Sequence, residues 1–389
     1  MYDEDFQNKK GVFFIYVSIF VISFSVGAYN PLIPIYAINF GATYADQGVI
    51  GAAYALPYII LPILIGFMSD RFDRRYFFLS GVSLTAISAI LFIFATDLVH
   101  IIAIRLFGGM AYAFMWPTVE ALLVDFSTEK ERIKVMGRYS FSWALGFLLG
   151  PPIGGLILEK TSFTTLFTIC FIFGLLAIFL AFHRLVYKKA LTQIKMLKKD
   201  VTNGKLGLLD RNLLPVYIVV VTYSMIFGVL FSIFPVYASY FGITSFQLGV
   251  LFALFGVVRT FTFLYSEKIS RIGSEKAFVS GLAIQALSLF LIAFFVGMGY
   301  FAIFLALIGF AMGIFSPLTL STASKLASRG RVGVTLGSVE ALFGLGDTIG
   351  PLSGGLIAES FGASIPYLSL SVISMLAIIP VTLIYFKYS

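Results

Sequence analysis

Residues 146–155 of the chain read GFLLGPPIGG, and residues 346–355 read GDTIGPLSGG. The two stretches share four glycines and one proline, and another glycine stands nine residues before each of them. Every shared position recurs 200 residues later, as Gly137, Gly146, Gly150, Pro151, Gly154 and Gly155 and then as Gly337, Gly346, Gly350, Pro351, Gly354 and Gly355. Six positions that repeat in register at one offset indicate that the chain consists of two homologous halves.

A second repeat lies earlier in each half. The sequence PIYAINFGAT begins at Pro34, and PVYASYFGIT begins at Pro235, 201 residues later. Pro117 and Pro317 also correspond, at an offset of 200 residues. The homology therefore extends along the halves and is not confined to the glycine-rich stretches.

The composition is that of a membrane protein. Hydrophobic residues make up 59% of the chain and charged residues 12%, whereas soluble domains contain about a quarter charged residues. A helix crosses the hydrocarbon core with about 20 apolar residues, and lipid-exposed backbone must satisfy its hydrogen bonds within the segment. Twelve stretches meet this requirement, at approximately residues 12–38, 46–68, 76–96, 98–124, 134–158, 162–184, 213–240, 246–266, 276–296, 299–323, 334–358 and 363–386. They are apolar on all faces, which excludes the alternating strands of a membrane barrel. We predict an all-α membrane protein with twelve transmembrane helices.

The basic residues predict the orientation. If the N-terminus is cytoplasmic, the loops on that side hold nearly all of the Lys and Arg, while the opposite loops hold only Lys160. Cytoplasmic loops of membrane proteins are enriched in these residues, so both termini are expected in the cytoplasm. The net charge of +8 then reflects topology and contact with anionic lipid, not a nucleic-acid partner. The lone Cys170 excludes a disulfide within the chain.

A long basic segment divides the twelve helices six and six. We predict an N-terminal six-helix bundle over residues 1–184, a cytoplasmic linker over 185–212 and a C-terminal six-helix bundle over 213–389. Because each half contains six spans, both halves begin on the same side of the membrane. They are therefore parallel, pseudo-symmetric repeats about an axis along the membrane normal.

Two further motifs identify a family. Residues 66–75 read GFMSDRFDRR, and residues 105–109 read RLFGG. With the glycine-proline repeat, they resemble the major facilitator superfamily and, within it, the drug:proton antiporter branch. The resemblance covers essentially the whole chain. It implies the major facilitator fold, and a membrane transporter located in the plasma membrane.

The resemblance also implies roles for the loop after the second helix. The family pattern there is G-x-x-x-D-[RK]-x-G-R-[RK], from which this chain departs only at Asp73. It implies that the aspartate lies between the halves near the start of the eleventh helix and stabilises the outward-open state. The conformational interface motif comprises Gly66, Asp70, Arg71, Arg74 and Arg75, together with Asp125, which we expect to pair with the Arg71/Arg74 cluster.

The glycine-proline repeat has two interpretations. In antiporters of this family the fifth-helix copy serves as a hinge and packing face. From the residues alone, small side chains four apart allow close helix approach, and Gly-Pro pairs permit a bend. The second copy in the eleventh helix favours packing and common ancestry over a specific signature of antiport.

Ionisable residues within the membrane are costly and are candidate functional residues. Here they are Arg105, Glu120, Arg259, Glu340 and Asp347. Asp347 lies nearest mid-membrane and is the candidate for proton coupling, which requires a carboxyl that gains and loses a proton near neutral pH. An ion pair with Arg259 or Arg105, or direct binding of a charged substrate, are the alternatives. Glu120 and Glu340 lie nearer the cytoplasmic side, where solvation or a role in the interface network is equally expected.

The substrate cavity is expected between the halves. Arg105, Tyr112, Trp116 and Glu120 share one face of the fourth helix, since residues advance by about 100° each. Further cavity candidates are Asn30 on the first helix and Tyr223 and Phe227 on the seventh.

These observations predict a secondary active transporter that works by alternating access. Its leading function is proton-coupled export of hydrophobic or amphipathic small molecules, because the expected cavity is aromatic. A proton symporter of a sugar or carboxylate, and a lipid or glycolipid flippase, are alternatives on the same fold. An enzyme is disfavoured because no catalytic or metal-binding motif occurs, and a receptor or scaffold because the loops are short. We expect no cofactor and no metal, a monomer, and as partners membrane lipids, the substrate and protons.

Overall fold

The computed structural model of the chain describes residues 2–69, 71–127, 132–185, 213–265, 268–269, 273–326 and 332–386. Most of the predicted linker, and Asp70 of the interface motif, lie outside the described residues. The helices within this part of the chain are α1 (Tyr2–Tyr29), η1 (Asn30–Leu32), α2 (Ile33–Ile38), α3 (Tyr44–Ala55), α4 (Pro57–Ser69), α5 (Arg74–Leu91), η2 (Phe92–Phe94), α6 (Leu98–Asp125), α7 (Arg132–Lys160), α8 (Phe163–Leu185), α9 (Leu214–Ser232), α10 (Phe234–Tyr240), α11 (Ser245–Leu264), α13 (Ser274–Phe294), α14 (Met298–Leu326), α15 (Val332–Phe361) and α16 (Ile365–Phe386).

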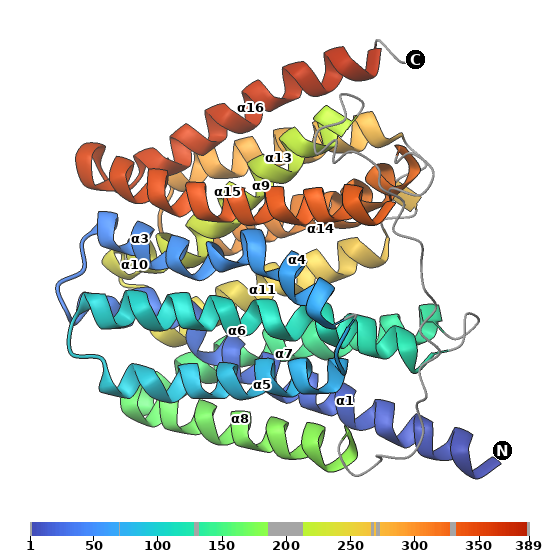
Figure 1. Cartoon of the computed structure of the whole chain (residues 1–389). Helices are drawn as coiled ribbons and strands as arrows, with labels where there is room; N and C mark the ends of the chain where they lie inside the picture. Colours follow the sequence, from blue (N-terminus) through green and yellow to red (C-terminus); the bar gives the residue numbers. More distant parts are fainter. Residues whose placement is uncertain are drawn as a thin grey trace.

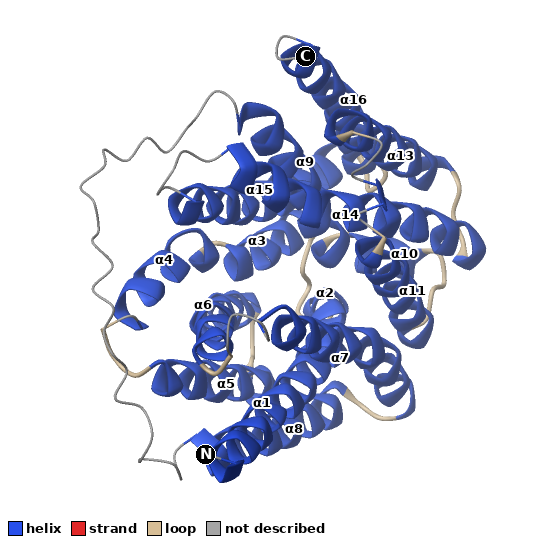
Figure 2. Cartoon of the chain, turned by 90° about the vertical axis from the view of Figure 1, so that its right-hand side faces the viewer, coloured by secondary structure: helices blue, strands red, loops and turns tan. Residues whose placement is uncertain are grey.

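Twelve spans in the described residues are long and apolar enough to cross a membrane, and the predicted all-α membrane fold is confirmed. Six belong to each half. Figure 1 shows both chain ends at one end of the molecule, which we call the terminal end. The opposite end, where α3 and α11 begin and α7 and α15 end, we call the far end (Figure 1). In the view onto the terminal end, α1, α5, α6, α7 and α8 group together below, and α9, α13, α14, α15 and α16 group above (Figure 2).

Three predicted spans are interrupted helices. The first contains the 3-10 turn η1, the second is broken between α3 and α4 at Leu56, and the seventh is broken at Ile233. A proline follows each break closely, at Pro31, Pro57 and Pro235. Proline lacks the amide that would continue the helical ladder, which accounts for these positions.

The turns that precede α3 and α11 at the far end have the same backbone conformation. Gly41 and Gly242 both have positive φ, at 77° and 75°, a region that residues with a Cβ rarely occupy. Thr43 and Thr244 then cap the next helix, each with a reciprocal capping box to the third helical residue. The repeat seen in the sequence is therefore a repeated turn that begins the second span of each half.

Among the described residues, the hydrophobic core that joins the two halves lies at the far end. One cluster there joins Tyr36 and Phe167 of the N-terminal half with Phe234 and Phe252 of the C-terminal half. Towards the terminal end the core divides into two clusters, one within each half. The interface between the halves is thus packed at the far end, and the two cores separate towards the terminal end.

Candidate functional site

Arg105 is held by neutral groups of its own half. Its side chain on α6 is buried, with 7% of its surface exposed. Its Nε donates to the Ile50 carbonyl of α3 at 3.2 Å, its Nη1 donates to Asn30 Oδ1, and its guanidinium lies 4.2 Å from the centre of the Tyr54 ring. The broken first span brings Asn30 to this position, at the start of η1. Hydrogen bonds and a cation–π contact therefore satisfy the buried charge without a carboxylate.

Asp347 lies on α15 and is half-buried. Among the described residues no cation lies within 4.0 Å of its carboxylate, although Arg105 is within electrostatic range. Arg259 lies instead against the Phe227 ring, with its Cζ atom 5.7 Å from the ring centre. In this conformation, Asp347 is therefore not in direct ion-pair contact with either arginine proposed as its partner.

An aromatic series follows α6 from Arg105 towards the terminal end. The Tyr112 ring lies 5.8 Å from Tyr54, 5.5 Å from Tyr58 and 5.3 Å from Trp116, between ring centres. Trp116 in turn lies 5.9 Å from Tyr139 and 6.2 Å from Trp143 of α7. The rings are tilted or edge-on to one another, which leaves aromatic faces available for a ligand.

These side chains enclose a pocket of about 160 Å³, lined by Tyr58, Tyr112, Trp116, Glu120, Tyr139 and Trp143. Tyr139 donates its hydroxyl proton to Glu120 Oε1 at 3.2 Å. The Trp116 indole Nε1 is buried without a hydrogen-bond partner in the described structure. The pocket thus offers one carboxylate, one unused donor and several aromatic faces.

The carboxylate of Glu120 is solvent-exposed, and so is that of Glu340 from the other half. The two are within electrostatic range of each other. Two exposed carboxylates therefore lie on the terminal-end side of the aromatic series, where the two cores have separated.

The C-terminal half presents an apolar aromatic group. Tyr223 of α9 lies 5.7 Å from both Phe315 and Phe343, and Phe227 lies 5.9 Å from Phe343. The predicted cavity residues Tyr223 and Phe227 are thus brought together by Phe343 of α15. They do not line the pocket around Trp116.

The interface motif is partly described. Arg74 forms an ion pair with Asp125 at 2.7 Å and also donates to the Ala121 carbonyl at 3.3 Å. The Arg71 guanidinium lies 4.0 Å from the Phe67 ring centre, and a Cβ at Gly66 would meet nothing within 4 Å.

Asp73, which replaces the family's glycine, is the N-cap of α5. It accepts from the Arg75 amide at 3.0 Å and pairs with the Arg75 guanidinium at 2.5 Å. These hydrogen bonds from Arg75 hold the pKa of the Asp73 carboxyl below its ordinary value. The added carboxylate is therefore used locally, in capping α5 and binding Arg75.

The repeated glycines have three different environments. Cβ atoms at Gly146 and Gly150 would lie 2.6–2.7 Å from backbone atoms of α1, and Gly154 is still closer. Their counterparts Gly346 and Gly350 likewise pack against backbone atoms of α9, whereas Gly354 packs against the side chains of Val229 and Ile233. Gly155 and Gly355 instead meet α11 and α3 of the opposite half, while Gly137 and Gly337 have nothing within 4 Å. The motif therefore packs each half internally and also contributes to the interface between halves.

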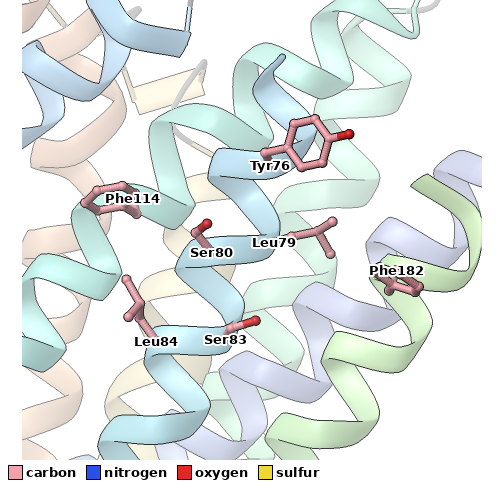
Figure 3. A pocket seen from close by; sticks show the side chains of 7 residues that line it. All are labelled: Tyr76, Leu79, Ser80, Ser83, Leu84, Phe114 and Phe182. Atoms are coloured by element: carbon pink, nitrogen blue, oxygen red, sulfur yellow. The ribbon is translucent and has the colours of Figure 1, made fainter. Parts of the chain in front are cut away.

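A separate groove lies on the outer surface of the N-terminal half. It has a volume of about 540 Å³ and is lined by Tyr76, Leu79, Ser80, Ser83, Leu84, Phe114 and Phe182 (Figure 3). The lining comes from α5, α6 and α8 of the N-terminal half alone, and the groove shares no lining residue with the pocket around Trp116. It is an apolar surface of the kind that lipid covers.

Three lining residues of the pocket, Tyr58, Tyr139 and Trp143, were not predicted from the sequence, and neither was Tyr54, which packs on Tyr112. A signal for them exists, because Tyr54 and Tyr58 of the second span, and Tyr139 and Trp143 of the fifth, are four residues apart in the sequence. The described residues contain no group of three or more potential metal ligands.

Two six-span halves, with polar and aromatic side chains at the membrane-buried surfaces between them, define a polytopic membrane transporter and not an enzyme. A family model described as Major Facilitator Superfamily matches residues 15–298 and 216–389, and the chain belongs to this superfamily.

Characterised relatives and solved structures agree with this assignment. Multidrug resistance protein 2 of Bacillus subtilis is 24% identical over 376 residues, covering 91% of this chain and 90% of the relative. The quinolone resistance protein NorA of Staphylococcus aureus is 26% identical over 367 residues, covering 90% of each chain. The crystal structure of the nucleoside transporter NupG (D323A mutant) superposes with a TM-score of 0.83 at 13% identity, covering 96% of this chain and all of that one. The chain therefore resembles the multidrug-transporter branch in sequence and shares the superfamily's fold, and is a protein of the cell membrane.

Proposed function

We propose that this protein exports hydrophobic or amphipathic small molecules in exchange for protons, by alternating access. The observation that carries the proposal is the pocket around Trp116, in which aromatic faces surround a single carboxylate. Aromatic rings bind planar apolar groups and cations on their faces, and Glu120 supplies the opposite charge to a cation. Two relatives bear names that refer to resistance against multiple drugs or quinolones, which supports the same substrate class.

The conformation supports uptake of substrate from the terminal end. The core is continuous between halves at the far end and divided towards the terminal end. With both termini in the cytoplasm, as the Lys and Arg distribution predicts, this is a state that faces the cytoplasm. An exporter must bind its substrate in such a state, before the halves rock to open the far end.

Asp347 is the proposed proton-coupling residue. It lies on the inter-half helix α15 with no direct cationic partner in the described part of the chain, yet within electrostatic range of Arg105. A carboxyl in this position can change its protonation without first breaking an ion pair. Proton binding changes the charge of Asp347, and binding of a cationic substrate changes the charge near Glu120. Each change would then alter the free energy of the other event through the electric field within the protein.

The test is transport by purified protein in proteoliposomes with an imposed pH gradient. The panel contains a fluorescent lipophilic cation, a sugar and an organic acid. We expect the cation to move against its gradient as protons move the opposite way, and the other two compounds to be ignored. Accumulation of the sugar with the proton gradient, without response to the lipophilic cation, would establish a nutrient symporter and overturn the proposal.

A further inference from the structure

Two seams close the far end. In the first, α7 packs on α11, where Cβ atoms at Gly155 and Gly249 would collide with backbone atoms of the opposite helix. In the second, α15 packs on α3, where Gly355 and Gly48 have the same relationship. At these four glycines the backbones of the two halves are in direct contact.

Each seam ends in a carboxylate that crosses to the opposite half. Glu159, at the end of α7, accepts a hydrogen bond from the Phe246 amide at 3.0 Å. Glu359, at the end of α15, accepts from the Tyr44 amide at 3.0 Å. Each carboxylate lies one helical turn beyond the seam glycine, Gly155 or Gly355, and therefore on the same helix face.

The capped starts of α3 and α11 supply the donors for these carboxylates. The first amides of a helix lack partners within the helix and carry a partial positive charge. In α3 the Thr43–Asp46 capping box satisfies the amides of both its residues, and in α11 Thr244 and Gln247 do the same. The amides between them, Tyr44 in α3 and Phe246 in α11, are donors that the carboxylates of the opposite half satisfy.

The sequence repeats this arrangement. Residues 154–159 read GGLILE and residues 354–359 read GGLIAE, which extends the glycine-proline repeat by one turn to a glutamate. We infer that Glu159 and Glu359 are paired latches of the far-end gate, and that both must release their helix starts before the far end opens. This inference rests on the alternating access of the proposed function, but not on the substrate or the coupling ion.

Both carboxylates are solvent-exposed. Exposed charge–helix contacts are weak individually, so each latch biases the conformational equilibrium and still breaks in a transport cycle. Removal of one latch is expected to raise the ratio of far-end-open to far-end-closed molecules by roughly two- to fivefold, and removal of both by about the product.

The experiment measures far-end separation directly. Spin labels on Thr164→Cys and Tyr300→Cys, exposed positions at the far end of opposite halves, report the distance by pulsed electron paramagnetic resonance in nanodiscs. Native Cys170 is 1% exposed and does not take the label. Glu159→Ala and Glu359→Ala should each increase the long-distance population, and the double variant should increase it further. Glu159→Gln and Glu359→Gln, which keep an acceptor but lose the charge, should have intermediate effects.

Asp97→Asn is the matched control. Asp97 is also a far-end carboxylate bonded to a helix-start amide, that of His100, but both belong to the N-terminal half. Its substitution should leave the distances unchanged. An unaltered distribution in the folded double variant, or an equal change in the Asp97 control, would overturn the latch. Because no substrate is needed, either outcome is independent of whether drug export itself is found.

Discussion

At the scale of single residues, the intramembrane charges are not equivalent. Arg105 is held by Asn30, the Ile50 carbonyl and Tyr54, whereas Asp347 has no direct cationic partner among the described residues. A buried guanidinium held in this way serves as a fixed positive charge. A carboxyl without such a partner is free to exchange its proton, which separates a structural charge from a candidate coupling group.

Asp347→Asn tests that distinction. The amide is similar in shape but cannot carry a proton, so transport driven by a pH gradient should fall by about an order of magnitude. Exchange of labelled for unlabelled substrate at equal pH, which needs no net proton movement, should persist. Glu275→Gln, which removes a carboxylate from the first turn of α13 in the same half, is the control and should transport normally. Undiminished pH-driven uptake by Asp347→Asn would eliminate this residue as the coupling site.

At the scale of helices, the glycine-proline motif assigns different tasks to neighbouring positions. Gly154 packs against the α1 backbone of its own half, and Gly155 packs against α11 of the other half. Pro151, on the same helix, also contributes to the interface between halves, because its carbonyl lies against the seam glycine Gly249. One helix turn therefore supports both a rigid bundle and a closable interface.

Gly154→Ala and Gly137→Ala form a matched pair within this motif. A Cβ at Gly154 would collide with backbone of α1 at Ala28, so α1 must shift, and such overpacking costs about 1–3 kcal/mol. A Cβ at Gly137 meets nothing within 4 Å, and alanine there should be neutral or should stabilise the helix by roughly 0.5–1 kcal/mol. Thermal unfolding in detergent should show a lower midpoint for Gly154→Ala only. Equal midpoints would mean that α1 and α7 are less tightly packed than described.

The helices themselves were predictable, and their interruptions were not. Twelve apolar runs of sufficient length left helix as the one structure that satisfies the backbone in lipid, so the spans followed from composition. A proline alone does not predict a break, because Pro117 and Pro151 lie within unbroken helices. Whether the helix breaks, as at Leu56 and Ile233, depends on how the surrounding helices pack around the proline. Likewise, the helical spacing placed Arg105, Tyr112, Trp116 and Glu120 on one face. It could not show that Tyr139 and Trp143 of α7 complete the pocket, because the contact between helices is not encoded in the periodicity of either.

At the scale of the whole molecule, the shared hydrophobic core of the described residues joins the two halves at the far end. The shared core and the two seams join the halves at the far end, whereas towards the terminal end each half has its own core. The direction of transport then depends on which end faces the cytoplasm, which the distribution of basic residues predicts to be the terminal end.

Cysteine labelling in intact cells checks this orientation. A membrane-impermeant maleimide should label Thr96→Cys and Val296→Cys, exposed positions at the far end of either half. It should not label Lys276→Cys, an exposed position at the terminal end, until the cells are permeabilised. Buried Cys170 contributes no background. Labelling of Lys276→Cys in sealed cells, with protection of the other two, would reverse the topology and with it the expected direction of export.

The two seams have a reciprocal pattern. Helix α7 of the first half contacts α11 of the second, and α15, the counterpart of α7, contacts α3, the counterpart of α11. In an isologous dimer the same relation holds, because one surface of the first subunit contacts a second surface of its partner, and the two-fold axis repeats this contact with the subunits exchanged. The single chain therefore retains the interface of a two-fold homodimer. Duplication and fusion of a gene for one six-helix subunit would produce this arrangement, with each ancestral contact now present twice and free to diverge.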